Sequence, residues 1–339
     1  MSEIHKVAEL AGVSTATVSR ALNFGTGKVK EDTLKRVLKA CKQVGYTTNS
    51  AGRNLRRKTS DAFGVLAYPS CLHLFNDPYY LHIFEGVEMA MMEHNKNLLI
   101  SGYNANKEQR QRPKFVADGS VAGMLMLGIF PEEEMLWAIE GALVPAVLVD
   151  TYSPTLACDA VLTDGAEAFA STARRFKECG HERIMMVTHA YPDYNKGIRM
   201  SAFIESAAAC GYPGSQVFTY AQVETDDDSM AAYQPAVELI KKNGVTAVAV
   251  NHDRMGLHLK AALEANGLRV PEDVSLVGYD AVEGSLSSTW LSTYKTDLRQ
   301  LGFIGGELII ERTEDPDLPL QKRLLQPEFL DRGSLRKLD

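Results

Sequence analysis

Two short amphipathic helices separated by a glycine are predicted near the start of the 339-residue chain. In residues 4–11, apolar side chains recur on one helical face, and Gly12 then permits a tight turn. Ser14 is a good N-cap for the next segment, TATVSRALN, whose apolar residues keep the helical period. Helix, glycine-containing turn and short helix together predict a helix-turn-helix over about residues 4–23. Two ordinary core helices are the weaker interpretation, because turn, cap and exposed face all agree.

The second predicted helix presents small polar side chains and one arginine to solvent. Short hydroxyls and a methyl group permit close approach to a major groove, and a guanidinium can bond guanine with both of its arms. The N-terminal part of such a helix reads base edges, whereas neighbouring polar residues bond phosphates. The expected base contacts are Thr15, Ala16 and Arg20. The expected phosphate contacts are Thr17, Ser19 and Asn23. A third helix around residues 31–45 completes the small core.

The charge distribution separates this segment from the rest. Residues 1–60 hold 12 Lys and Arg against 4 Asp and Glu, a net charge of +8, and the remainder carries −15. A small basic unit on a large acidic body fits a DNA-contacting module on a body that DNA repels. The alternative, a solvated basic helix, accounts equally well for the charge alone. The agreement between charge and helix pattern favours double-stranded DNA as a partner.

Several classes of protein are disfavoured by missing features. The five cysteines are widely spaced without a CxxC pair, so neither a zinc site nor a disulfide framework is expected. The start lacks a signal-peptide pattern and no apolar run reaches about 18 residues, which predicts a cytosolic protein without a membrane partner. No GxSxG, phosphate-binding loop or HExxH pattern occurs. We therefore expect neither an enzyme nor a bound cofactor or metal.

From Phe63 onward, short apolar runs alternate with helical stretches. Repeated strand–helix units predict α/β lobes with parallel sheets and helices on both faces. The length accommodates two such lobes. Ligands in this architecture bind beyond the carboxyl ends of the strands, which places a site between the lobes.

The segment VAELAGVSTATVSRALN and the later GYTTNSAGRNL resemble the lactose-repressor (LacI/GalR) family of bacterial regulators. Further segments, DPYYLHIFEGVE, GHERI and LRVPEDVSLVGYD, extend the resemblance over nearly the whole chain, and DPYYLHI is most similar to regulators of galactoside and related saccharide operons. The resemblance implies an all-α headpiece and a two-lobed core with the fold of periplasmic sugar-binding proteins. It implies a headpiece over 1–48, a hinge and linker over 49–61, and a core over 62–339. The lobes would comprise 62–161 with 293–324, and 162–292 with 325–339.

The hinge of that family folds into a short helix on operator DNA and enters the minor groove. By resemblance, Leu55 would be the wedge that opens a base step. The hinge residues expected at DNA are Asn49, Arg53, Leu55 and Arg56. The chain departs from the family pattern with Thr48 in place of proline and Gly52 in place of alanine. A glycine within a helix costs about 1 kcal/mol relative to alanine, so the hinge is expected to be less stable than is usual in the family.

A sugar needs charge-assisted hydrogen bonds to its hydroxyls and an aromatic face beneath its C–H bonds. Acids that end strands, an arginine that opens a helix and two tyrosines at a helix start fit that need. The candidate effector contacts are Tyr79, Tyr80, Asp150, Arg199, Asp253 and Asp280. An Asp after a strand is also a common helix cap, and Tyr80 also suits a core position. His252 stands where the family usually has asparagine, and Trp290 is a weaker candidate.

These residues predict a sequence-specific DNA-binding regulator, a repressor of a carbohydrate-utilisation operon that responds to a small sugar such as a galactoside. Control by a protein corepressor or by a non-sugar metabolite is the alternative. The C-terminus has no leucine heptads, so a homodimer is expected rather than a tail-bundled tetramer. The dimer would place two headpieces on a pseudo-palindromic operator in the bacterial cytosol, associated with the nucleoid.

Overall fold

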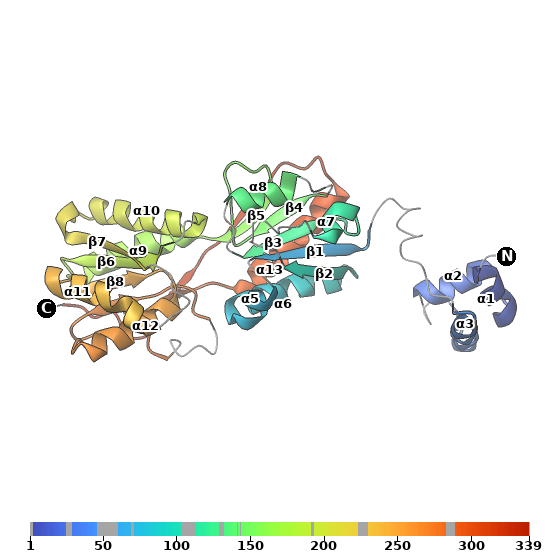
Figure 1. Ribbon diagram of the computed structural model, residues 1–339, viewed down its shortest axis with the longest axis horizontal. Coiled ribbons are helices and arrows are strands. Elements are labelled where there is room, and N and C mark those ends of the chain that lie inside the picture. Colours follow the sequence, from blue (N-terminus) through green and yellow to red (C-terminus); the bar gives the residue numbers. More distant parts are fainter. Residues whose placement is uncertain are drawn as a thin grey trace. The chain divides into compact units, whose positions relative to one another are not determined.

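The computed structural model (Figure 1) describes residues 3–24, 29–45, 60–68, 71–102, 113–128, 132–140, 142, 144–190, 193–222, 230–282 and 289–338. The chain divides into two units, Met1–Thr59 and Ser60–Asp339. The first unit is helical, and the second contains parallel sheets covered by helices. The predicted fold class, an all-α headpiece followed by an α/β core, is confirmed.

The first unit is a bundle of three helices. They are α1 (Glu3–Ala11), α2 (Thr15–Phe24) and α3 (Glu31–Val44). Gly12 has a φ of 62°, which turns the chain after α1. The Ser14 Oγ accepts a hydrogen bond of 3.1 Å from the Thr17 amide, so Ser14 caps α2 as predicted. The buried side chains between the helices are Val7, Ala8, Ala11, Val18, Ala21, Val37, Ala40 and Cys41.

The second unit contains two lobes, and lobe one is built on a six-stranded parallel sheet in the order β11–β5–β4–β3–β1–β2. Its strands are β1 (Ala62–Tyr68), β2 (Asn97–Gly102), β3 (Met124–Gly128), β4 (Ala146–Val149), β5 (Asp159–Thr163) and β11 (Lys322–Leu325). Its helices are α5 (Cys71–Asn76), α6 (Pro78–Glu93), α7 (Lys114–Asp118), α8 (Glu132–Glu140) and α13 (Leu298–Glu314).

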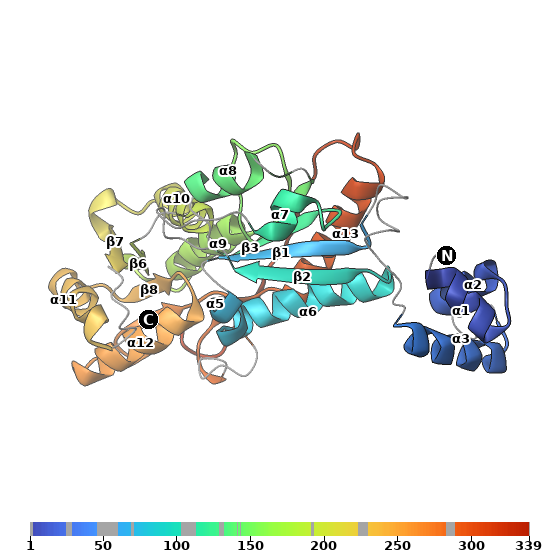
Figure 2. The same cartoon turned by 45° about the vertical axis from the view of Figure 1, so that its right-hand side comes forward.

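Successive residues of β1 face opposite sides of this sheet, so both faces are buried. Phe63 and Val65 pack with α6 and α13, whereas Leu66 packs with α7 and α8. Figures 1 and 2 show the two helix layers on either side of the strands. The apolar runs in the sequence are continuous because neither face of the sheet meets water.

Glycines allow α6 and α13 to pack closely. A Cβ at Gly302 would overlap the Ile83 carbonyl oxygen, and a Cβ at Gly86 would overlap the Arg299 carbonyl oxygen. Because backbone atoms line both contacts, no side-chain rotation can relieve such a clash. The helix contact therefore requires glycine at both positions.

Lobe two is built on a four-stranded parallel sheet in the order β7–β6–β8–β9. Its strands are β6 (Ile184–His189), β7 (Val217–Gln222), β8 (Ala247–Val250) and β9 (Ser275–Val277). Its helices are α9 (Gly165–Glu178), α10 (Tyr194–Ala209), α11 (Gln234–Asn243) and α12 (Asp253–Ala265), with short 3-10 turns at Gly214–Gln216 and Met230–Tyr233. Two apolar clusters lie on the two faces of this sheet.

The chain passes between the lobes three times. It leaves lobe one after β5, returns through β10 (Thr293–Lys295) and leaves again before β12 (Glu328–Leu330). β10 pairs with β12 in an antiparallel two-stranded sheet, and Lys295 also bridges to Asp280 of lobe two. These crossings lie a few residues from the predicted ones, because β5 continues to Thr163 and β10 remains paired to lobe two.

A buried ion pair joins the end of α13 to the start of β5. The Arg312 Nε donates to Asp159 Oδ2 at 2.8 Å, and its Nη2 donates to Asp159 Oδ1 at 3.0 Å. Arg312 also bonds the carbonyl oxygens of Pro316, Leu318 and Pro319, so both charges are fully hydrogen-bonded. This network holds the segment that leads into β11.

Replacing Gly302 by alanine is expected to destabilise the core by about 1–3 kcal/mol, because α13 must move away from α6. Urea unfolding followed by circular dichroism measures the change. Gly197→Ala is the matched control, since Gly197 lies in α10 with nothing near its absent Cβ. Equal stability of the two variants would contradict the close packing of α6 and α13.

Candidate functional site

The outer face of α2 carries five of the residues predicted to contact DNA. Ala16, Ser19 and Arg20 are exposed, and Thr15 and Thr17 are partly buried. The Thr17 hydroxyl lies 2.9 Å from the Ser14 Oγ, so it also supports the first turn of the helix. The arrangement leaves one helix face open for a groove, as the sequence predicts.

Other predicted DNA contacts fall outside what the structure describes. The side chain of Asn23 is one of them. The hinge residues Asn49, Arg53, Leu55 and Arg56 also lie outside the described residues. Their roles stay predictions.

Polar residues gather in the second unit where strands of both lobes end. Asp150 follows β4 of lobe one, Asn251 follows β8 of lobe two, and Asp280 follows β9 of lobe two. Arg199 enters from α10, with its guanidinium carbon 4.1 Å from the centre of the Tyr279 ring. We call Asp150, Arg199, Asn251 and Asp280 the cleft cluster.

Asp150 connects the two lobes. Its Oδ2 accepts a hydrogen bond of 2.8 Å from the Tyr79 hydroxyl, and its carbonyl oxygen accepts one of 2.9 Å from Asn195 Nδ2 of lobe two. Its φ of 55° is uncommon for a residue other than glycine. Burial raises the pKa of Asp150 to about 6, although Arg199 and the Tyr79 hydroxyl favour the charged form. Its Oδ1 is buried and makes no hydrogen bond to any described residue.

Arg199 is buried among ring, carbonyl and carboxylate groups. Its Nη1 donates to the Asn251 carbonyl oxygen at 3.0 Å, and its Nε lacks a partner among the described residues. A Cβ at Gly165 would lie 2.7 Å from that Nε, so glycine there makes room for the guanidinium. The Nε is therefore a buried donor without a described partner, beside the residue that begins α9.

Asp280 lies close enough to Arg199 for their charges to interact. Its φ is 105°, and its amide donates to the Tyr294 carbonyl oxygen at 2.9 Å. Burial raises the pKa of Asp280 well above its ordinary value, and the Arg199 guanidinium offsets part of that rise. A ligand that donates a hydrogen bond to Asp280 would stabilise its ionised form.

The structure gives Asp253 a different place from the predicted one. Its Oδ1 accepts a hydrogen bond of 2.7 Å from the Thr293 hydroxyl, and its Oδ2 accepts one of 3.1 Å from the Ala281 amide. One oxygen thus joins α12 to β10, the other joins α12 to the chain that follows β9, and the carboxyl group is buried. Asp253 supports the interlobe connection, and its role as an effector contact stays a prediction. His252 caps α12 through its Nδ1, and burial lowers its pKa to about 3.

The two tyrosines that begin α6 differ in environment. Tyr79 reaches Asp150, whereas Tyr80 is buried in the core of lobe one beside Ile83. The two rings meet edge to face with their centres 5.3 Å apart. Tyr80 as an effector contact stays a prediction. The weaker candidate Trp290 packs against the core of lobe two, with Lys260 over its ring.

Sequence reasoning missed two polar residues near the cluster. Asn251 has a buried Oδ1 that no described residue bonds, and the Asp193 carboxylate pairs with His189 Nε2 at 3.2 Å. Asn251 directly follows an apolar strand, a signal that was available in the sequence.

A cation and two aromatic rings form a second contact between the lobes. Lys322 of β11 places its Nζ 3.9 Å from the centre of the Tyr152 ring and donates to the Tyr194 hydroxyl at 2.9 Å. Tyr152 and Tyr194 also meet edge to face, with ring centres 4.8 Å apart. This contact adds to the Asn195–Asp150 bond in holding the N-terminus of α10 against lobe one.

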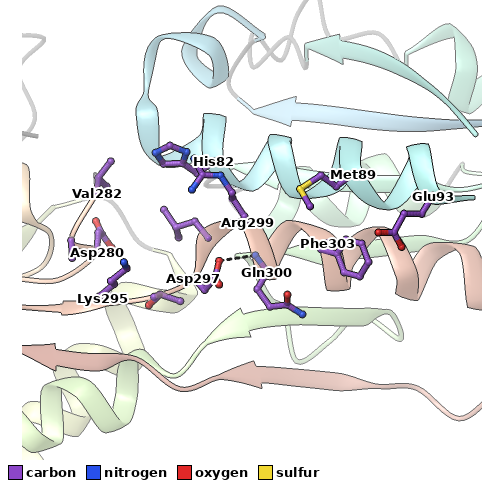
Figure 3. A pocket seen from close by; sticks show the side chains of 13 residues that line it. His82, Met89, Glu93, Asp280, Val282, Lys295, Asp297, Arg299, Gln300 and Phe303 are labelled. Carbon is purple, nitrogen blue, oxygen red and sulfur yellow. Dashed lines mark hydrogen bonds between the residues drawn. The ribbon is translucent and has the colours of Figure 1, made fainter. Parts of the chain in front are cut away.

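A pocket of about 440 Å³ opens beside the cluster, between α6 and the chain from Asp280 to Phe303. Figure 3 shows Asp280 and Lys295 at one end, with Met89 and Phe303 toward the other. The pocket touches the cleft cluster only through Asp280. Across the described ranges, no three His, Cys, Asp or Glu side chains are placed to hold a metal, and no helix has the length and apolarity needed to cross a membrane.

Comparison with known proteins identifies both units. Residues 3–49 match the model of bacterial regulatory proteins of the lacI family, and residues 173–335 match a periplasmic binding protein-like domain. The chain is 28% identical to the transcriptional repressor PurR of Aliivibrio fischeri strain MJ11, over 99% of this chain and 98% of that protein. It is 27% identical to the repressor CytR of Escherichia coli K12, over 98% and 96% of the two chains.

The chain belongs to the lacI family of bacterial regulatory proteins. Two solved structures have the same fold over nearly their whole length. One is a CelR–cellobiose complex, with 24% identity, 98% and 99% coverage and a TM-score of 0.70. The other is the lac repressor bound to ONPG, with 19% identity, 98% and 99% coverage and a TM-score of 0.75. This lacI-family chain is a DNA-binding transcription repressor.

The raised pKa of Asp150 predicts a pH-dependent stability difference. Because the folded state holds this proton more tightly than the unfolded chain, ionisation of Asp150 costs stability as pH rises from about 4 through 6. Asp150→Asn should therefore gain stability relative to the native chain over that interval, on the order of 2 kcal/mol. Urea unfolding of both proteins between these pH values measures the gain.

Asp273→Asn is the control for this measurement. The Arg269 amide and guanidinium lower the pKa of exposed Asp273, so its ionisation favours the folded state, the opposite of Asp150. Asp273→Asn should therefore gain no stability relative to the native chain as pH rises through the interval. The same absence of a gain in Asp150→Asn would contradict the raised pKa.

Proposed function

We propose that the chain represses a carbohydrate-utilisation operon and that a small sugar, such as a galactoside, changes its affinity for the operator. The observation that carries the effector site is a set of buried polar atoms without partners among the described residues. They are Asp150 Oδ1, Arg199 Nε and Asn251 Oδ1. Buried polar atoms are nearly always hydrogen-bonded, and leaving one unpaired costs about 1–3 kcal/mol. A ligand that bonds all three recovers that cost.

Sugar hydroxyls suit this set because each is both donor and acceptor. Asp150 and Asn251 offer acceptors, and Arg199 offers a donor from the facing helix. The effector contacts that we propose are Tyr79, Asp150, Arg199, Asn251 and Asp280. Two similar structures hold cellobiose and ribose, which supports a sugar as the effector without favouring a galactoside.

The proposed response couples ligand binding to the lobe arrangement. Asn195 bonds the Asp150 backbone, so a ligand on the Asp150 carboxylate acts at the contact between the lobes. A sugar that binds one lobe arrangement more tightly shifts the protein toward it, and operator affinity changes by the same coupling free energy. The regulator would act on double-stranded operator DNA in the bacterial cytosol.

A second copy of the chain is the proposed partner. Apolar side chains are exposed along α5, α6 and the edge strand β2, which lie beside one another in lobe one (Figure 2). They are Phe75, Met89, Met92, Leu99 and Ile100. An unpaired apolar edge of this kind favours pairing with an identical edge by two-fold symmetry. The dimer would supply two α2 helices to an operator.

Two arginine variants should separate DNA binding from effector binding. Arg20→Ala removes an exposed guanidinium from α2 and should weaken operator binding at least about tenfold, with sugar affinity unchanged. Arg199→Met should abolish the sugar response while operator binding persists. Operator fragments selected from genomic DNA serve for the binding assay, and calorimetry with a sugar panel measures the ligand.

Arg36→Ala and Arg269→Met are the matched controls, because both remove exposed arginines outside these sites. Arg36→Ala should weaken DNA binding only through the loss of general charge. If Arg199→Met responds to sugar like the native chain, the cleft is not the effector site. If Arg20→Ala binds operators as tightly as the native chain, α2 does not read them.

Met92→Glu should convert the dimer to a monomer, because it places a charge in the centre of the proposed apolar contact. Met92 is 72% exposed in the single chain, so the change leaves the fold intact. Sedimentation equilibrium measures the mass. Ile204→Glu on α10 is the control and should leave the dimer unchanged, and a monomeric native chain would refute the pairing.

A further inference from the structure

The cleft between the lobes has few buried cationic side chains, which limits its ability to bind anions. Among the lysines and arginines that the structure describes, only Arg199 and Arg312 are buried. Arg312 is tied to Asp159, so a ligand at the cleft cluster meets a single buried guanidinium. That guanidinium already faces Asp150 and Asp280.

Nearby cationic groups are committed elsewhere. Lys322 is held by two tyrosines, and Lys196 donates to the Ala190 carbonyl oxygen. His189 pairs with Asp193. Lys295 is exposed at the end of the neighbouring pocket (Figure 3), and His252 is the helix cap of α12. An anionic ligand would therefore be buried beside two carboxyl groups without a cation of its own.

The buried polar atoms without partners also favour a neutral ligand over an anionic one. Asp150 Oδ1 and Asn251 Oδ1 accept hydrogen bonds, and each requires a donor from the ligand. A hydroxyl supplies that donor, whereas a fully ionised phosphate group in its place supplies only acceptors. The Thr188 hydroxyl is also buried without a described partner near the end of β6. It can donate to or accept from a ligand, so it does not distinguish the two forms.

We propose that this cleft admits an uncharged, hydroxyl-bearing ligand and excludes the phosphorylated form of the same molecule. This inference rests on the proposed function and specifies the chemical form that the site senses. Hydrolysis of a glycosidic bond, in which water adds across the C–O bond, supplies such a ligand. Transfer of a phosphoryl group from a nucleoside triphosphate to a ligand hydroxyl, with release of the nucleoside diphosphate and the hydroxyl proton, removes it. The regulator thus responds before the phosphorylation step.

Calorimetry on the full chain with matched pairs of ligands tests this. The pairs are ribose and ribose 5-phosphate, glucose and glucose 6-phosphate, and galactose and galactose 6-phosphate, with cellobiose and its 6′-phosphate. At least one neutral sugar should bind, and its phosphate should bind at least about 100-fold more weakly, since burying an anion without a cation of its own costs several kcal/mol. A phosphate that binds as tightly as its parent sugar overturns the inference but leaves a sugar effector in place. Silence across both halves of every pair refutes the proposed function itself, and the inference with it.

Variants test whether Asp150 and Asp280 cause the preference for the neutral ligand over its phosphate. Asp150→Asn combined with Asp280→Asn removes both carboxyl groups and should reduce the ratio between neutral and phosphorylated ligand to about tenfold or less. Asp273→Asn, at the opposite end of β9 from Asp280, should keep the native ratio. An unchanged ratio in the double variant would overturn the role of these acids. If that variant does not fold, the ratio in the native chain still decides the inference.

Discussion

The buried guanidinium of Arg199 is the contact on which the arrangement of strand ends depends. It lies over Tyr279 at the end of β9, bonds the backbone after β8 and faces the carboxyl group that follows β4 of the other lobe. An arginine cannot lose its charge in water-poor surroundings, so these partners must stay near it. The two sheets therefore end in one polar site, and the ligand, the lobe contact and the choice of ligand charge all depend on the same residue.

The elements that positioned this site could be predicted because their patterns are local. Val7, Ala8 and Ala11 give α1 its buried face, and the apolar run around Val65 predicts a strand with both faces covered. The same reasoning found Asp150, Asp280 and Arg199, since residues after parallel strands share an edge. Short elements without such a pattern, α5 and β12 among them, were not predicted.

Partners distant in the sequence decided the rest. Asp253 and Asp280 both follow strands, yet Thr293 engages only the first, and nothing near Asp253 in the sequence indicates this. Tyr79 and Tyr80 are adjacent, and the rotation of α6 against α13 determines which one reaches Asp150. That rotation depends on Gly86 and Gly302, which lie far apart in the chain. The sequence therefore predicted that binding residues lie at strand ends. Which residues at those ends are free to bind a ligand depends on packing between distant parts of the chain.

The three passages between the lobes have a consequence for how such a regulator changes through evolution. Lobe two consists of a long central piece and the C-terminal tail, where the Ser334 hydroxyl bonds Leu276 and the Leu338 amide bonds Cys179. No single stretch of the gene encodes either lobe. Exchange of one continuous gene segment with a relative therefore cannot replace a whole lobe without also replacing part of the other.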